Sequence, residues 1–250
     1  MHDSPHGSAL YCELAAPGDT TAKTYERHGW QIREGHTGHA HHHTITAGEV
    51  SLLDAAACRR LIDATAALLA DYLAAARRIL VVGLGNAALT ADRLGPAVCG
   101  KLTLAGQAPV GRTLYSFVPG VPAVTGIPTD RLVTLAAHAI RAERILAVDA
   151  LCARSAAMLG QVVQLSDEGL VPGSGVQSDA GAASPEIADR TMPCPVVTAG
   201  VPTVIRTTLP AGGQTRYLVT TGDADRMVER WSSILASAIM KAAMLGAGGK

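Results

Sequence analysis

Aromatic residues are scarce in this sequence, since phenylalanine, tryptophan and tyrosine together make up 3% of its 250 residues. A core built around large rings is therefore excluded, and alanine, valine and leucine must fill it. Long apolar runs are lacking as well: no stretch reaches the roughly eighteen apolar residues that a membrane-spanning helix needs. Because the chain also opens without a charged-then-apolar leader, we expect a cytoplasmic protein with no membrane partner.

Charge of one sign is not in excess either, since 21 lysines and arginines balance 21 aspartates and glutamates. Such a chain has no overall electrostatic attraction to nucleic acid, so a direct nucleic-acid partner is not expected. The five cysteines lie far apart, and none belongs to a Cys-x-x-Cys pair. This spacing indicates neither a disulfide framework nor a zinc knuckle, and it favours buried thiols in a reducing compartment.

What the sequence does contain is typical of a globular α/β protein. Apolar residues make up 48% of it and charged residues 17%, a balance that can bury a sizeable core. Short β-favouring runs alternate with segments of helical apolar spacing, so we expect one α/β domain over residues 48–250 with a mostly parallel sheet. The expected strands lie within 79–82, 111–118, 144–148, 160–166, 195–199 and 216–220, and the expected helices within 50–76, 92–104, 130–141 and 223–245.

Residues 1–47 lack a clear periodicity, and we expect an irregular or partly stranded arm there. Within it the stretch GHTGHAHHHTIT holds five of the nine histidines, namely His36, His39, His41, His42 and His43. Neutral imidazoles can bind zinc or nickel, but no cysteine or carboxylate sits within this stretch to complete a defined site. The tract is therefore expected to be solvated or to bind metal adventitiously, and we expect neither a catalytic metal nor a cofactor.

The chain is organised around ILVVGLGNAALTADRLGP, residues 79–96. Its apolar start predicts a buried strand, and Gly83 and Gly85 allow a sharp turn at the carboxyl end of that strand. In an open α/β sheet, ligands bind at this end of the strands. Asp92 follows where a helix should begin, so the simplest interpretation of its carboxylate is a helix N-cap.

Three of the expected strands end in polar, glycine-marked turns. The first leads through Asn86 to Asp92, the second delivers Asp149, and the third delivers Asp167 ahead of the loop 172–175. Parallel strands have their carboxyl ends at one edge, so Asp92 and Asp149 could face each other there. Two carboxylates held close cannot both ionise easily, and one can keep a proton while the other accepts one from water. That arrangement suits attack of water on an amide, with acid and base roles belonging to the pair.

Three other chemistries fit the sequence less well. The glycine turn resembles a dinucleotide-binding motif, but residues 99–118, where that motif needs a carboxylate, contain no Asp or Glu. A serine or cysteine triad needs a histidine, and His138 is the only one after residue 43. The Gly-Lys-Ser/Thr signature of a phosphate-binding loop is absent.

Five stretches, in one order along the chain, resemble the germination protease family, the endopeptidases of spore-forming bacteria. They are VVGLGN(x)5DRLGP at 81–96, PGV…TGI at 119–127, ILAVDALCARS at 145–155, QLSDEGLVPGSGV at 164–176 and AGVPTVI at 199–205. The closing helix is similar to that family's as well. A collinear set of long matches is far more specific than a single glycine motif.

The resemblance implies a fold related to the hydrogenase maturation proteases, with a twisted sheet flanked by helices. It implies an endopeptidase that cleaves small acid-soluble spore proteins during germination, in the cytoplasm of the forespore and the spore core. It also implies a zymogen, whose propeptide could lie within 1–47, and a homo-oligomer that is typically a tetramer.

The family's proposed catalytic aspartates fall on Asp92 and Asp149, the same pair that the residues themselves indicate. Candidate supporting or substrate-binding residues are Asn86, Asp167, Gly173, Ser174 and Gly175. Two alternatives stay open. A nickel-dependent peptidase of the hydrogenase maturation type would need a histidine near the aspartates, for which His138 is the only candidate outside the arm. A non-catalytic binding domain would keep the fold without the chemistry.

Overall fold

The computed structural model describes residues 22–37, 40–102, 112–167, 169, 187, 192–208 and 216–245. Its strands are β1 (Lys23–Arg27), β2 (Trp30–Thr37), β3 (Ala40–Thr46), β4 (Arg78–Gly83), β5 (Thr113–Phe117), β6 (Arg144–Ala153), β7 (Val162–Ser166), β8 (Val196–Thr208) and β9 (Arg216–Val219). Its α-helices are α2 (Ala55–Tyr72), α3 (Leu94–Lys101), α4 (Pro122–Thr125), α5 (Thr129–Ile140) and α6 (Ala224–Leu245). The 3-10 turns are η1 (Val50–Leu52), η2 (Thr90–Asp92) and η3 (Ala156–Met158).

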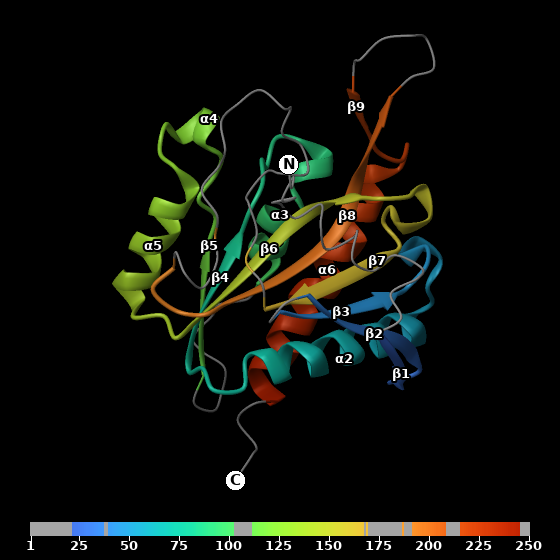
Figure 1. Ribbon diagram of the computed structural model, residues 1–250, viewed down its shortest axis with the longest axis horizontal. Helices are drawn as coiled ribbons and strands as arrows, with labels where there is room; N and C mark the ends of the chain where they lie inside the picture. Colours follow the sequence, from blue (N-terminus) through green and yellow to red (C-terminus); the bar gives the residue numbers. More distant parts are fainter. Residues whose placement is uncertain are drawn as a thin grey trace.

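These strands form one sheet in the order β1-β2-β3-β7-β8-β6-β4-β5, with β9 paired to β8 (Figure 1). Neighbouring strands among β5, β4, β6 and β8 run parallel. From β8 outward through β7, β3 and β2 to β1, and from β8 to β9, the pairs are antiparallel. The expected single α/β domain is confirmed, but its sheet is mixed rather than mostly parallel: three of the described strand pairs are parallel and five are antiparallel.

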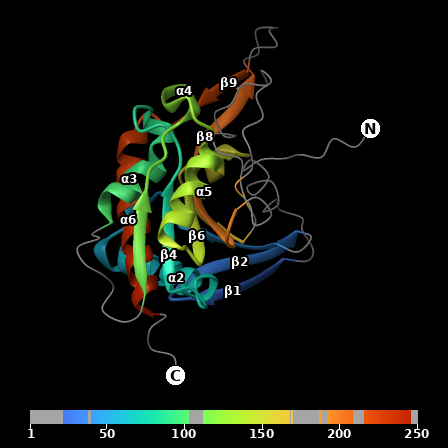
Figure 2. The same cartoon turned by 90° about the vertical axis from the view of Figure 1, so that its left-hand side faces the viewer.

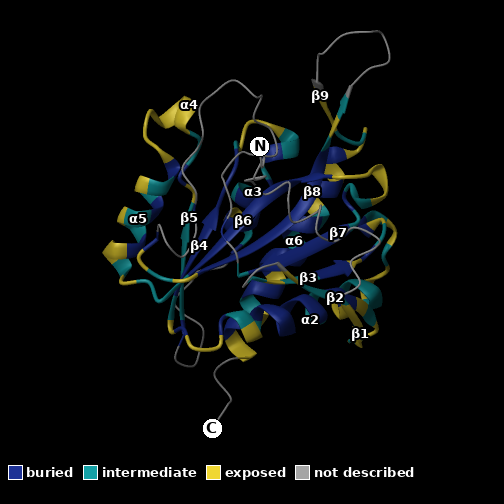
Figure 3. Ribbon diagram, in the orientation of Figure 1, coloured by how far each residue is buried: buried dark blue, intermediate teal, exposed yellow. Residues whose placement is uncertain are grey.

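Helices cover both faces of the sheet (Figure 2). α2, α3 and α6 pack on one face, where Val81, Leu146 and Val197 join the larger core. α5 packs on the other face, against a smaller core that contains Leu80 and Ile145. The central strands are buried, whereas the outer sides of the helices are exposed (Figure 3). Successive side chains of a strand point to opposite faces of the sheet. The face of a polar strand residue can therefore be inferred from the core to which its apolar neighbours belong.

Residues 23–37 and 40–46 contain three strands of the sheet, so the expected arm at 1–47 is partly stranded there, and these strands belong to the domain expected to begin at residue 48. β1, β2 and β3 form an antiparallel meander, and β3 pairs with β7. Ile32 and Ile45 alternate with polar neighbours and are fully buried in the larger core. This alternation of apolar and polar residues has the period of a strand. It is hard to recognise in the sequence, because histidine and threonine occupy most of the other positions of β3.

α2 begins later than the expected helix 50–76 for a local reason. The Asp54 carboxylate accepts a hydrogen bond from the Ala57 N–H at 2.7 Å and caps the helix at Ala55. Leu61 and Leu68 on its apolar stripe are buried in the core. Within the described part of the chain, no helix combines the length and apolarity required to cross a membrane.

Candidate active site at the end of strand β4

The loop after β4 folds tightly against β6. Gly85 has φ +109°, and a Cβ there would overlap the carbonyl oxygen of Asp92, so glycine is required. The Leu84 N–H donates a 2.9 Å hydrogen bond to the Val148 carbonyl. The backbone after the strand is therefore held directly over the residue that precedes Asp149.

Asp92 ends the turn η2 and is only 3% exposed. Its Oδ2 accepts a 2.7 Å hydrogen bond from the Asn86 N–H, across the loop that the glycines shape. The expectation that Asp92 caps the next helix is wrong: α3 starts at Leu94, with Arg93 as its N-cap and no side-chain cap. Its carboxylate is thus tied to the β4 loop, and it does not stabilise the helix end.

Asp149 lies inside β6, which continues to Ala153, so the expectation that the strand ends at this residue is wrong. β4 ends opposite Val148, which makes Asp149 the first β6 residue beyond the end of β4. The side chain is 1% exposed; its Oδ1 accepts a 2.8 Å hydrogen bond from the Ala150 N–H. Its Oδ2 is buried and has no hydrogen-bond partner in the described structure.

The two carboxyl groups influence each other electrostatically. Burial raises the pKa of Asp149 well above its ordinary value, and the charge of Asp92 raises it further, against the hydrogen bond from Ala150. Burial also raises the pKa of Asp92, while the Asn86 N–H lowers it. The raised pKa values favour the protonated form of both carboxyls. If one of them ionises, the Asn86 N–H can stabilise the charge on Asp92 Oδ2, whereas Asp149 Oδ2 has no hydrogen-bond donor in the described structure. A pair of this kind can hold one proton and accept another.

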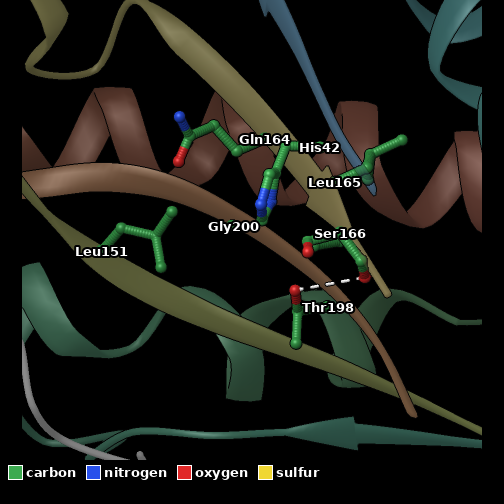
Figure 4. A pocket seen from close by; sticks show the side chains of 8 residues that line it. His42, Leu151, Gln164, Leu165, Ser166, Thr198 and Gly200 are labelled. Carbon is green, nitrogen blue, oxygen red and sulfur yellow. Dashed lines mark hydrogen bonds between the residues drawn. The ribbon is translucent and has the colours of Figure 1, made fainter. Parts of the chain in front are cut away.

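A small pocket lies among β3, β6, β7 and β8 (Figure 4). Gly200 of β8 pairs with Asp149 and lines the pocket. Leu151, two residues beyond Asp149 on β6, lines the pocket as well. The other lining residues come from β3, β7 and β8: His42, Gln164, Leu165, Ser166, Thr198 and Ala199. The Thr198 hydroxyl donates to the Ser166 carbonyl at 3.4 Å. The buried polar side chains of Thr198 on β8 and Ser166 on β7 therefore lie on the strand next to the one that carries Asp149 and on the strand beyond it.

Asp167 does not join the pair. β7 runs antiparallel to β8, so its carboxyl end lies at the opposite edge of the sheet from the end of β4. There the Asp167 Oδ1 accepts a 2.7 Å hydrogen bond from the His41 N–H. The expectation that three strand ends share one edge holds for β4 and for the Asp149 region of β6, and it is wrong for β7.

The remaining predicted residues differ in how they are placed. The Asn86 side chain accepts a 3.0 Å hydrogen bond from the Ala88 N–H, which shapes the loop, and a substrate role for it stays a prediction. Gly173, Ser174 and Gly175 lie outside the described residues. His138 is exposed on α5, the helix packed against Leu80 and Ile145.

Sequence reasoning missed Thr203 of β8. This residue is 1% exposed, and its hydroxyl donates a 2.5 Å hydrogen bond to the carbonyl of Ala91, next to Asp92. From the other side, Arg93 forms a 2.8 Å ion pair with Asp225 of α6. Thr203 stands in the stretch AGVPTVI, so the available signal was a polar residue inside an otherwise apolar strand.

The fold and the site together define an α/β protein with a buried pair of aspartates beside the end of a parallel strand, an arrangement suited to acid–base chemistry. Comparison with known families gives the particular assignment. The family model described as germination protease matches residues 37–243. The chain belongs to the germination protease family.

Individual relatives match a shorter part of the chain. The germination protease of Oceanobacillus iheyensis is 38% identical over 135 residues, which cover 50% of this chain and 36% of the relative. That of Clostridium perfringens strain 13 is 32% identical over 166 residues, covering 63% of this chain and 47% of the relative. The matched part of this chain thus spans less than half the length of these relatives.

One of the solved structures matched by the chain is the NiFe hydrogenase maturation protease HycI from Thermococcus kodakarensis. It is 16% identical, and the match covers 69% of this chain and 98% of that one, with a TM-score of 0.39.

Proposed function

We propose that this protein is an endopeptidase that hydrolyses small acid-soluble spore proteins during germination, in the cytoplasm of the forespore and spore core. The observation that carries the proposal is the buried aspartate pair, in which the charge of Asp92 raises the pKa of Asp149. Membership of the germination protease family supports the reaction class and the substrate. We propose further that the protein is made as a zymogen and assembles as a homotetramer.

In this mechanism the aspartate pair holds one proton and activates one water molecule. The ionised member of the pair removes a proton from the water as it attacks the peptide carbonyl. The protonated member donates a hydrogen bond to the carbonyl oxygen and later transfers a proton to the departing amine. The two steps exchange the protonation states within the pair, which titrates as a unit, so the acid and base roles belong to both residues. Asn86, whose N–H holds the Asp92 carboxylate, keeps that group oriented.

The small pocket lined by Gly200, the strand partner of Asp149, is our candidate anchor for a small group of the substrate. A peptide bond held at the aspartates would direct a neighbouring substrate side chain toward Leu151 and Gly200. Gly200 pairs with Asp149 in the parallel register of β6 and β8, so one wall of the pocket lies next to the aspartate along the sheet. The residues Gly173, Ser174 and Gly175 remain candidates for the same task.

The test compares Asp92→Asn, Asp149→Asn and Asp63→Asn with the wild type, using a purified small acid-soluble spore protein as substrate. Each of the first two variants should lose at least about 100-fold in kcat/KM, because an amide can neither accept nor donate the catalytic proton. Asp63 forms an exposed ion pair with Lys241 between α2 and α6, so its variant is the matched control and should keep full activity. Circular dichroism checks that each variant is folded.

Three results would overturn the proposal. Full activity in either site variant would remove that aspartate from the mechanism. Loss of activity on treatment with a chelator, restored by nickel, would favour the hydrogenase maturation type of peptidase. Binding of the spore protein without cleavage, by both the complete chain and a version trimmed within 1–47, would favour a non-catalytic binding domain.

A further inference from the structure

Three potential metal ligands meet on the β2–β3 hairpin, away from the aspartate pair. Glu34 and His36 lie on β2, and His41 lies on β3. One ligand atom from each residue lies within 4.8 Å of the other two. Among the residues that the structure describes, this is the one group of three or more histidines, cysteines or carboxylates close enough to hold a metal ion.

The pairing of the strands brings these side chains together. His36 stands directly opposite His41 in the antiparallel register. Glu34 precedes His36 by two residues, so both side chains lie on the same face of β2. The two imidazole rings have centroids 4.1 Å apart at an angle of 69°. The sequence pattern alone could not reveal the site, since Glu34 precedes the histidine tract and joins it only through the hairpin.

The distances are close to those that a metal ion requires. Glu34 Oε1 is 3.8 Å from His36 Nε2 and 3.9 Å from His41 Nδ1. Tetrahedral zinc, with bonds of about 2.0–2.1 Å to nitrogen and similar bonds to oxygen, places neighbouring ligand atoms about 3.4 Å apart. The two glutamate–histidine distances must each shorten by about half an ångström, and the two imidazole nitrogens, which lie within 4.8 Å of each other, by at most about 1.4 Å. Both rings are nearly half exposed, at 46% and 47%, and can make these adjustments.

Surrounding groups hold His41 in position. Its backbone N–H donates to Asp167 Oδ1 at 2.7 Å, and its carbonyl accepts a 3.2 Å hydrogen bond from the Tyr72 hydroxyl. Tyr72 also lies 2.7 Å from His43 Nδ1, on the neighbouring position of the same strand face. The backbone of one ligand is thus fixed by Asp167, which follows β7, and by Tyr72 of α2 before any metal binds, which lowers the entropy lost on binding.

We propose that Glu34, His36 and His41 form a binding site for a divalent transition-metal ion, with zinc as the first candidate. Two imidazoles and one carboxylate are a ligand set that zinc accepts, and water completes the coordination on the exposed side. The bound ion would link β2 to β3 and so stabilise the antiparallel half of the sheet. The site is separate from the aspartate pair, so the inference does not depend on the proposed peptidase activity.

The experiment uses the full chain without an affinity tag, stripped of metal and titrated with zinc sulfate by calorimetry. Cobalt(II) absorption follows the same site spectroscopically. His36→Ala, His41→Ala and Glu34→Gln should each weaken one zinc site by at least about tenfold, since each removes a ligand. Zinc should raise the Tm of the wild type, and it should raise that of the variants much less.

His138→Ala is the matched control, because it removes one exposed histidine from α5, outside the cluster. This variant should bind zinc as the wild type does. Equal zinc affinity in the wild type and in the His36→Ala/His41→Ala double variant would overturn the proposal. So would a loss of binding as large in His138→Ala as in His36→Ala, which would indicate adventitious binding to any histidine. Circular dichroism of the metal-free variants separates loss of the site from loss of the fold.

Discussion

Asp149 carries an uncommon combination of features for a single residue. Its carboxyl is almost fully buried, one of its oxygens has no hydrogen-bond partner in the described structure, and a second buried carboxyl raises its pKa. Buried polar groups are almost always paired, because leaving one unpaired costs free energy. Thr65 on α2 also has an unpaired buried oxygen, but a hydroxyl is neutral and costs less to bury. At Asp149 an unpaired, buried carboxyl oxygen lies near a second acidic side chain, a combination that costs free energy and is typical of a functional site.

The raised pKa of Asp149 predicts how stability depends on pH. In the unfolded chain this carboxyl titrates near 3.8, and in the folded state it titrates well above that value. Between the two pKa values the folded state holds the extra proton, so the free energy of unfolding should fall as the pH rises through this window. Asp149→Asn should remove part of that fall and gain stability relative to the wild type as the pH increases. Urea unfolding from pH 4 to pH 8 measures both slopes.

Asp54 provides the opposite case in the same experiment. Its hydrogen bond from the Ala57 N–H lowers the pKa of this carboxyl, so its contribution is present above pH 3.8 and is lost as the pH falls. Asp54→Asn keeps a capping side chain and removes the charge, so it should lose stability relative to the wild type at neutral pH and match it in acid. Parallel pH profiles for Asp149→Asn and the wild type would contradict the assignment of a raised pKa.

At the scale of elements, the close approach of α3 to the sheet determines where Asp92 lies. Gly95, in the first turn of α3, packs against the backbone of Leu84 and Val148, and a Cβ there would overlap the carbonyl oxygens of both. Gly83 of β4 faces Gly95 from the other side, and a Cβ at Gly83 would overlap the Gly95 carbonyl oxygen. The glycines of the two elements therefore let helix and strand touch through their backbones.

Two substitutions within α3 test this packing. Gly95→Ala should destabilise the fold by about 1–3 kcal/mol, because backbone atoms cannot move aside as a flexible side chain can. Gly100→Ala, five residues further along the same helix, meets nothing within 4 Å. It should stabilise the fold by about 0.5–1 kcal/mol, because alanine is the better helix former. Chemical denaturation measures both changes, and a Gly95→Ala variant as stable as the wild type would refute the close approach.

The elements also show what the sequence could predict. β4, β5 and α6 follow from apolar runs and helical spacing, which are local patterns, and their bounds are close to those expected. The antiparallel direction of β7 could not be predicted, since an apolar run reads the same for either direction of pairing. Asp92 and Asp149 were chosen as the ends of two parallel strands, although β6 continues past Asp149, and Asp167 was assigned to the wrong edge because β7 runs antiparallel.

At the scale of the whole molecule, α6 connects the parts that the site needs. It packs on both α2 and α3, and Trp231 at its centre donates a 2.7 Å hydrogen bond to the Gly160 carbonyl before β7. Arg112, just before β5, donates to the Ala242 carbonyl near the other end of α6. The ion pair between Arg93 and Asp225 links the start of α6 to the loop of Asp92. The closing helix therefore supports the edge of the sheet that carries the aspartates.

The packing of α6 predicts a large effect from a single leucine. Leu235 of α6 is fully buried in the larger core, so Leu235→Ala should cost about 2–5 kcal/mol through lost apolar contacts and the cavity left behind. Leu135 of α5 is 66% exposed, and the same substitution there should change stability by less than about 0.5 kcal/mol. Denaturant unfolding of both variants provides the comparison. Because α6 holds the loop of Asp92 through Asp225, Leu235→Ala should also lower the proposed peptidase activity more than Leu135→Ala does. Equal effects of the two would mean that the helix is not the support inferred for this site.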